Sequence, residues 1–479
     1  MGQEGKKRNA VCIQTGAWLA DRTICLEMPA GWHVSVFPLR RMKVLGDRDI
    51  ETAFACPVGQ SRISERARGK QRIAVIVDDI SRPTPAHRLI PPLLRELKSA
   101  GISNHQIRFI VAVGNHRPLS RQEMIWKLGA PVVSRYPVRN HNFAASDLVC
   151  LGTGKWGVPL WLDAWVAEAD MKIGIGSIIP HDAAGFSGGG KCVIPGVSGF
   201  PTLLALHGLF EKRGRGEQQG DSDDFRSCID SLAGMAGLDT VINTVVDEKR
   251  NPVGLVTGDM IGAFEAGAAM ARSCYTFTVR RDMAEKTDIV LLNAYPLDMD
   301  PDQLLKAVAP AIVFPHARVV LYNEATDGTM FRGLNVKSRS LTGGKGCRVG
   351  RSFLPQPAGN RKRMLRRIIR KSRILPLALK VPGLFEKMRR QQRNYEAHQM
   401  YCEAVRPDER YRENSDAVHN DSLIVVSPHL SPVDFYRRFP DGRLFKNWQQ
   451  ARHTLESMVP DARIAVLPSA PLQIPEVIE

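Results

Sequence analysis

The sequence predicts an α/β protein of two domains, each built on a mostly parallel sheet, with an active-site cleft between them. Short apolar runs rich in β-branched residues alternate with helical patterns, which is typical of parallel α/β sheets. A chain of 479 residues is also too long for one ordinary hydrophobic core. We expect an N-terminal domain over 1–277 and a C-terminal domain over 278–479, with a basic insertion near 360–395.

The individual elements follow from local patterns. A helix is predicted over 85–100, with Gly101 as its stop, and the capping box Ser120-x-x-Glu123 opens another. Residues 260–274 form an Ala- and Gly-rich helical pattern. Residues 23–28 and 32–37 alternate in the manner of edge or antiparallel strands. Buried strands are predicted at 72–77, 106–113, 171–179, 240–246, 288–292, 317–322, 422–427 and 462–467.

Composition indicates a soluble globular protein, with 43% hydrophobic and 24% charged residues. The nine cysteines stand singly, so the sequence predicts neither a zinc site nor a disulfide framework. Scattered thiols favour a reducing cytoplasm. We find no apolar run typical of a signal peptide or a transmembrane helix, and we expect a cytoplasmic protein.

The formal net charge of +17 is concentrated in one segment. Residues 361–393 contain 13 Lys and Arg, and Glu386 is their only acidic residue. Residues 361–373 form an amphipathic pattern, and we interpret them as a solvated helix packed on the second domain. Contact with a membrane surface, RNA or another anionic partner, or steering of anionic substrates, stays open.

Polar residues follow four of the predicted strands. Ligands of open α/β sheets bind beyond the carboxyl ends of the strands, so these residues are expected to converge on one site. Each of them taken alone is equally compatible with a cap or a turn. They are Asp78, Asp79 and Arg82, then Asn115 and His116, then His181, and finally the stretch from Tyr295 to Lys306.

The stretch 179–207 combines His181, Lys191 and His207 with a cluster of glycines. Gly185-x4-Gly190-Lys191 resembles a phosphate-binding P-loop, but Cys192 stands where that motif needs Ser or Thr for Mg²⁺. Pro195 and Gly196 also prevent the helix that would bind the phosphate. A P-loop-like nucleotide hydrolase therefore remains only as the alternative enzyme.

Assembled in order, these residues resemble the lactate racemase family. The resemblance rests on Asp79-Ile-Ser-Arg-Pro-Thr-Pro85, Gly114-Asn-His-Arg-Pro118, Pro180-His181 with Gly185-Phe-Ser-Gly-Gly-Gly-Lys191 and Pro195-Gly196, His207, and Gln303-x-x-Lys306 after Tyr295-Pro296. Each motif alone is weak, whereas the ordered combination over 79–306 is specific. Residues 1–70 and 330–479 match only in general α/β character.

The resemblance implies a racemase or epimerase of a 2-hydroxy acid, which acts by proton-coupled hydride transfer through a 2-keto intermediate. The implied cofactor is a nickel-pincer nucleotide, Ni(II) pyridinium-3-thioamide-5-thiocarboxylic acid mononucleotide, supplied by cofactor-biosynthesis enzymes. In this interpretation Lys191 carries the cofactor, His207 is the metal ligand, and His116 and His181 exchange the proton. Asp79, Arg82, Gly188 and Gly189 line the cofactor, and Arg82, Gln303 and Lys306 bind the substrate.

The residue types suit that chemistry. Histidine titrates near neutrality and can both take and give a proton, and two of them serve the two faces of the substrate. Imidazole is also a suitable nickel ligand. On an apolar helical run such as that around His207, however, a lone histidine is more often a core residue. A non-catalytic binder that uses the basic segment is the third hypothesis.

Overall fold

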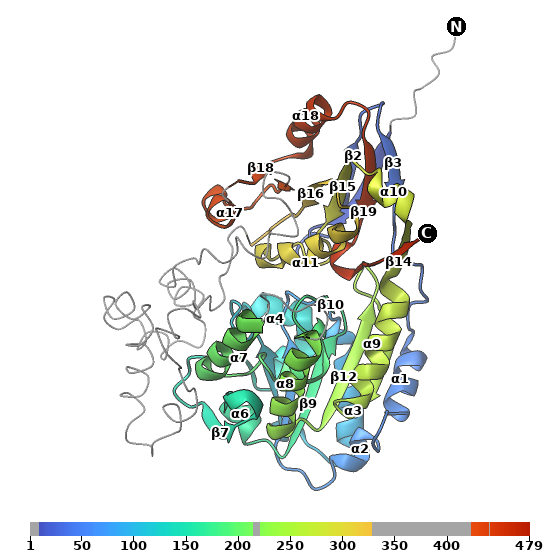
Figure 1. Cartoon of the computed structure of the whole chain (residues 1–479). Helices are drawn as coiled ribbons and strands as arrows, with labels where there is room; N and C mark the ends of the chain where they lie inside the picture. Colours follow the sequence, from blue (N-terminus) through green and yellow to red (C-terminus); the bar gives the residue numbers. More distant parts are fainter. Residues whose placement is uncertain (1–8, 214–220, 328–422, 440) are drawn as a thin grey trace, which may run out of the picture.

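The structure, a computed structural model, describes residues 9–213, 221–327, 423–439 and 441–479. Figure 1 shows two layered units, one in the lower and one in the upper half of the view, each with a central sheet and its helices. Within the described residues, every neighbouring pair in the two six-stranded sheets is parallel except β12 with β13. The predicted α/β class is confirmed.

The first sheet is buried on both faces. Along β4, Ile73, Val75 and Val77 pack into one core, while Ala74 and Ile76 pack into another. Such two-sided burial explains why its strands are continuous apolar runs in the sequence. In spatial order the strands are β13 (Pro252–Gly258), β12 (Thr240–Val246), β9 (Met171–Ser177), β4 (Ile73–Asp78), β5 (Ile107–Ala112) and β6 (Val138–Asn140).

Helices cover both faces of this sheet. The predicted capping box is present at α4, where Ser120 accepts a hydrogen bond from the Glu123 amide and Glu123 accepts one from the Ser120 amide. One core receives side chains from α1 (Asp47–Ala55), α2 (Ile63–Arg66), α3 (Ala86–Ser99), α4 (Arg121–Leu128) and α5 (Ala130–Arg135). The other receives them from α6 (Ala164–Ala167), α7 (Phe200–Arg213), α8 (Asp221–Met235) and α9 (Gly262–Tyr275).

The second sheet is built in the same way. On β15, Val290 and Leu292 pack into one core and Ile289 and Leu291 into the other. Its strands, in spatial order, are β18 (Arg443–Phe445), β17 (Leu423–Val426), β16 (Arg318–Tyr322), β15 (Ile289–Asn293), β19 (Arg463–Leu467) and β3 (His33–Val36). Among the described residues, its helices are α10 (Arg281–Glu285), α11 (Leu304–Val308), α17 (Pro432–Arg438) and α18 (Trp448–Met458).

The N-terminal strands belong to the second sheet. β3 pairs with β19, and the hairpin of β1 (Ala10–Thr15) and β2 (Arg22–Glu27) packs on the same core. The predicted range 1–277 had assigned these residues to the first domain, because sequence order gives no information on a pairing across more than 400 residues. The boundary at 277/278 itself stays a prediction.

The β1–β2 hairpin also corrects the interpretation of the cysteines. Cys12 and Cys25 lie directly opposite each other on the two strands and form a disulfide. Their spacing in the sequence did not indicate the pair, because the register of the hairpin decides which residues face each other. Cysteine usage therefore no longer supports a reducing compartment, and the cytoplasmic location stays a prediction.

Smaller elements complete the fold. Two-stranded ribbons are formed by β7 (Val149–Thr153) with β8 (Pro159–Leu162), by β10 (Pro180–His181) with β11 (Gly185–Phe186), and by β14 (Thr276–Arg280) with β20 (Ile474–Ile478). Residues 301–308 form a 3-10 turn, Pro301–Gln303, followed by α11. In the described ranges no helix combines the length and apolar character needed to cross a bilayer.

Candidate active site

Three neighbouring strands of the first sheet end at the same edge. β9, β4 and β5 lie side by side and run parallel, so their carboxyl ends meet there. Asp79 follows β4, His116 follows β5, and His181 follows β9. The predicted convergence of these polar residues is therefore present in the fold, with His116 and His181 on either side of the strand that precedes Asp79.

Asp79 and His116 form a hydrogen-bonded pair. The Asp79 Oδ2 atom lies 2.6 Å from His116 Nδ1, while Asp79 Oδ1 accepts from the Ser81 hydroxyl at 2.6 Å and from the Ser81 amide at 3.1 Å. Burial raises the pKa of Asp79, but His116, Arg82 and Ser81 outweigh it and hold the pKa below its usual value. An ionised Asp79 directs Nδ1 of His116 toward itself, so Nε2 is the atom left for proton exchange.

His181 lies in the tight β10–β11 ribbon. Its Nδ1 atom is 3.2 Å from the Ala183 amide nitrogen and 3.0 Å from Asp182 Oδ1. The imidazole is 14% exposed, whereas the Asp182 side chain is 59% exposed. Burial, and after it the charge of Lys191, lowers the pKa of His181 to about 3, so the imidazole is neutral at pH 7.

Lys191 lies on a four-residue 3-10 helix, Gly189–Cys192, which does not continue into an α-helix. The next helix, α7, begins at Phe200, so Lys191 lacks the phosphate-binding helix of a P-loop, as the sequence predicted. The Lys191 amide donates to the Gly188 carbonyl at 3.2 Å, but its side chain forms no hydrogen bond or ion pair with a described residue. Burial, followed by the charges of Arg82 and Arg226, lowers the pKa of Lys191 to about 7.

The glycines before Lys191 are required by the backbone. Gly188 and Gly189 have φ of +82° and +57°, and a Cβ atom on Gly189 would lie 2.4 Å from Nη2 of Arg226. Neither the conformation nor the space admits a side chain. The turn therefore presents Lys191 from a fixed, side-chain-free backbone.

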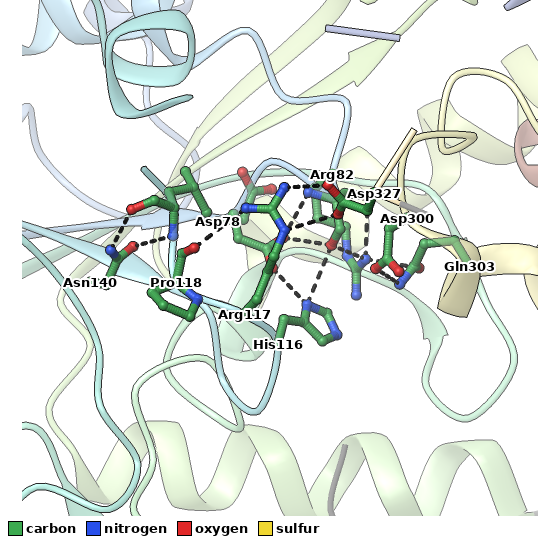
Figure 2. Close-up of polar contacts among 12 residues, drawn as sticks. Asp78, Arg82, His116, Arg117, Pro118, Asn140, Asp300, Gln303 and Asp327 are labelled. Atoms are coloured by element: carbon green, nitrogen blue, oxygen red, sulfur yellow. Dashed lines mark hydrogen bonds and ion pairs between the residues drawn. The ribbon is translucent and has the colours of Figure 1, made fainter. Parts of the chain in front are cut away.

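Residues of the second sheet reach the same edge. Arg82 Nη1 donates to Gln303 Oε1 at 3.0 Å (Figure 2), and the same oxygen accepts from Lys306 Nζ at 2.6 Å. Gln303 Nε2 in turn donates to Asp300 at 3.0 Å. Burial and then the charge of Arg82 lower the pKa of Lys306 well below its usual value. The residues predicted to hold a carboxylate thus meet across the two sheets.

Arg117 is a second link between the sheets. Its Nε and Nη2 atoms donate to Asp327 at 2.9 and 2.7 Å (Figure 2), and Nη1 donates to Glu123 at 2.9 Å. Glu123 belongs to α4 of the first unit, whereas Asp327 follows β16 of the second. Bidentate, charge-assisted bonds of this kind fix geometry strongly. They hold the residue next to His116.

His207 is on α7, but its side chain lies outside the described residues, so its predicted role as metal ligand stays a prediction. In the part of the chain described by the structure, no group of three or more His, Cys, Asp and Glu side chains is arranged to hold a metal ion.

Comparison with known proteins agrees with this geometry. A sequence profile described as the lactate racemase N-terminal domain matches residues 19–218. The lactate racemase of Lactiplantibacillus plantarum is 32% identical over 288 residues, which are 59% of this chain and 66% of that protein. The lactate racemase of Thermoanaerobacterium thermosaccharolyticum is 28% identical over 264 residues, 54% of this chain and 61% of that protein. The chain belongs to the lactate racemase family.

Solved structures show that the family fold extends further along the chain. The lactate racemase apoprotein from T. thermosaccharolyticum superimposes with a TM-score of 0.63 at 20% identity, covering 97% of this chain and all of that one. A protein from Thermotoga maritima gives 0.57 at 15% identity over 92% of this chain. The matched sequence regions span less than two thirds of the two curated relatives.

Sequence reasoning missed two site residues of this family member. Arg117 stands inside the Gly114–Pro118 motif, yet its partner Asp327 is 210 positions away, and nothing local in the sequence indicates that pair. Asp182 is adjacent to His181 and was available as a signal, since carboxylates commonly orient imidazoles. Asp79 was predicted to line the cofactor, and the structure shows it bonded to His116.

Proposed function

We propose that the chain is an isomerase that racemises or epimerises a 2-hydroxy acid. The supporting observation is that His116 and His181 follow the two strands flanking β4. Neighbouring strands are about 5 Å apart, so the strands on either side of β4 are separated by roughly 10 Å. A small substrate carbon then has an imidazole available on each face.

Inversion at the hydroxyl-bearing carbon requires hydrogen to leave one face and return to the other. The carbon-bound proton of a hydroxy carboxylate is a very poor acid, so loss of hydride to give a 2-keto acid is the easier route. One histidine takes the hydroxyl proton. After the keto acid has rotated to present its other face, the second histidine returns a proton to the oxygen. General acid–base catalysis of this type contributes about 10²- to 10⁴-fold.

The substrate carboxylate would be held by Arg82, Gln303 and Lys306. Arg82 and Lys306 both donate to Gln303 Oε1 here, and a carboxylate oxygen is an acceptor of the same kind. Burial, and after it the repulsion among Arg82, Lys191 and Lys306, lowers the pKa of both lysines, and an anion would relieve that repulsion. These groups favour a small anionic substrate.

The residues present fit the cofactor that the family resemblance implies. Lys191 has no partner among the described residues, and its pKa of about 7 makes a neutral, nucleophilic amine available for a thioamide link. His207 would ligate nickel, and Gly188 and Gly189 would allow close approach to the backbone. When bound, the nickel-pincer nucleotide supplies a hydride acceptor. The alternative nucleotide hydrolase is not favoured, because no α-helix begins at Lys191 and the next one, α7, begins at Phe200.

The test is a panel of enantiopure 2-hydroxy acids, with lactate first, assayed for loss of optical activity with cofactor-loaded protein. We expect turnover of one member, and a loss of about 10²-fold or more in His116→Ala and in His181→Ala. His105→Ala, in the 3-10 turn before β5, is the matched control and retains activity. Covalently bound cofactor in Lys191→Ala would exclude the tether, and wild-type activity in either histidine variant would exclude the acid–base pair.

We also propose three further properties of the protein. These are the cytoplasmic location, the dependence on cofactor-biosynthesis enzymes, and an anionic partner for the basic segment. That segment, 361–393, lies outside the described residues.

A further inference from the structure

The two histidines differ in what surrounds Nδ1. At His116 the nearest neighbour of Nδ1 is the Asp79 carboxylate at 2.6 Å, with the Ser81 hydroxyl at 3.4 Å already donating to Asp79. An acceptor of this kind keeps a proton on Nδ1. Nε2 of His116 is then free to exchange a proton in both directions of the reaction.

At His181 two groups compete for Nδ1. The Ala183 amide at 3.2 Å can only donate, while Asp182 Oδ1 at 3.0 Å can only accept when ionised. One neutral ring nitrogen cannot satisfy both. If Nδ1 accepts from Ala183, the ring proton is on Nε2, and His181 cannot take a proton there. If Nδ1 donates to Asp182, Nε2 has a free lone pair and can act as a base.

We propose that Asp182 is a positioning residue that selects the tautomer of His181 in which Nε2 is unprotonated. The Ala183 amide is the competing partner that takes over Nδ1 when Asp182 is lost. The assignment of Nε2 as the reacting atom rests on the proposed function, whereas the choice of tautomer does not. The backbone of the β10–β11 ribbon, in which His181 pairs with Gly185, holds both competitors against the ring.

The charges around His181 and Asp182 favour a neutral imidazole and an ionised carboxylate. Lys191 and Lys306 are the cations that face His181, and Lys306 also faces Asp182. Burial, and after it these cations, disfavour the imidazolium, so His181 is neutral near pH 7 and the tautomer is the property that decides its role. Burial raises the pKa of Asp182, but His181, and after it Lys306, outweigh that effect and hold the pKa below its usual value, and an ionised carboxylate is the stronger acceptor.

The experiment uses unloaded protein with 15N-labelled histidine at neutral pH, where the 15N shifts of each imidazole report which nitrogen carries the proton. His181 is assigned by its loss in His181→Gln. We expect the Nδ1–H form in the wild type and a shift to the Nε2–H form in Asp182→Asn. Asp182→Glu restores the carboxylate and the original tautomer. Asp230→Asn, which removes a carboxylate facing Lys191, is the matched control and leaves His181 unchanged.

An Nε2–H signal in the wild type, or no change in Asp182→Asn, overturns the proposal. A second readout uses the loaded enzyme, where kcat/KM of Asp182→Asn is expected to fall about 10²-fold and to recover in Asp182→Glu. Because two enantiomers have an equilibrium constant of one, kcat/KM must fall equally in both directions. If no 2-hydroxy acid is turned over, the proposed function fails. The tautomer measurement still tests whether Asp182 selects the tautomer of His181.

Discussion

At the scale of single residues, the site depends on charges that are buried together. Lys191 contributes to the low pKa of His181, after burial itself. Conversion of the Lys191 amine to a neutral thioamide would remove the same charge. The thioamide link would therefore also raise the pKa of His181 toward the neutral range, in which an imidazole exchanges protons.

The Lys191→Met variant tests this coupling in unloaded protein. A nearby cation disfavours the imidazolium, so its removal raises the pKa of His181 above its value of about 3. Burial remains and keeps the pKa below the ordinary value of about 6.5. Titration of the His181 imidazole signals by NMR measures the change. Lys172→Met, which replaces another buried lysine, is the control, and an equal shift in both variants would contradict a specific effect of Lys191.

At the scale of elements, α4 supports the loops that carry the site. Glu123 in its first turn binds Arg117 next to His116. Lys127 in its last turn is fully buried, pairs with Asp78 at 2.8 Å and donates to the Arg82 carbonyl at 3.0 Å. The helix thus fixes the ends of both β4 and β5 from one side.

Lys127→Met is expected to destabilise the protein by about 3–5 kcal/mol, because it leaves the Asp78 carboxylate without its cation. Among the described residues, Asp78 then keeps its hydrogen bonds from the Thr84 hydroxyl and the Ser177 amide. The double variant Lys127→Met/Asp78→Asn should lose less free energy of unfolding than the two single variants together, because it no longer contains an uncompensated buried charge. Urea unfolding of the four proteins measures the coupling, and strict additivity would refute it.

At the scale of the whole molecule, strands near both ends of the chain pair with strands that are distant in the sequence. β3, near the N-terminus, is the edge strand of the second sheet, and β20, at the C-terminus, pairs with β14 (Figure 1). Trp32, just before β3, is 3% exposed, and its indole donates to the Val459 carbonyl at 3.1 Å. The second sheet therefore needs residues from both ends of the chain.

Trp32→Ala is expected to cost about 3–5 kcal/mol, as for other large core truncations. Amide hydrogen exchange should then accelerate in β19 and β15 of the second sheet more than in β4 and β5. Phe54→Ala, in the core under the first sheet, is the matched variant and should give the reverse pattern. Identical exchange patterns in the two variants would mean that the two sheets unfold as one unit, contrary to this expectation.

Much of this could be predicted from the sequence, because the signals are local. Apolar runs with β-branched residues predicted β4, β5, β9 and β15 within one or two residues at each end. The Ser120 capping box predicted the start of α4. Since residues beyond the carboxyl ends of parallel strands lie at one edge of a sheet, the placement of Asp79, His116 and His181 at that edge could be predicted.

Only the tertiary structure decided which distant groups face one another. The Cys12–Cys25 disulfide depends on hairpin register, and the place of β3 depends on a partner strand more than 400 residues away. Arg117 donates to Asp327, and Nδ1 of His181 lies next to Asp182, because packing fixes the direction of each side chain. Sequence periodicity specifies which elements form and which face is buried, whereas partner choice is set by non-local geometry that no local pattern contains.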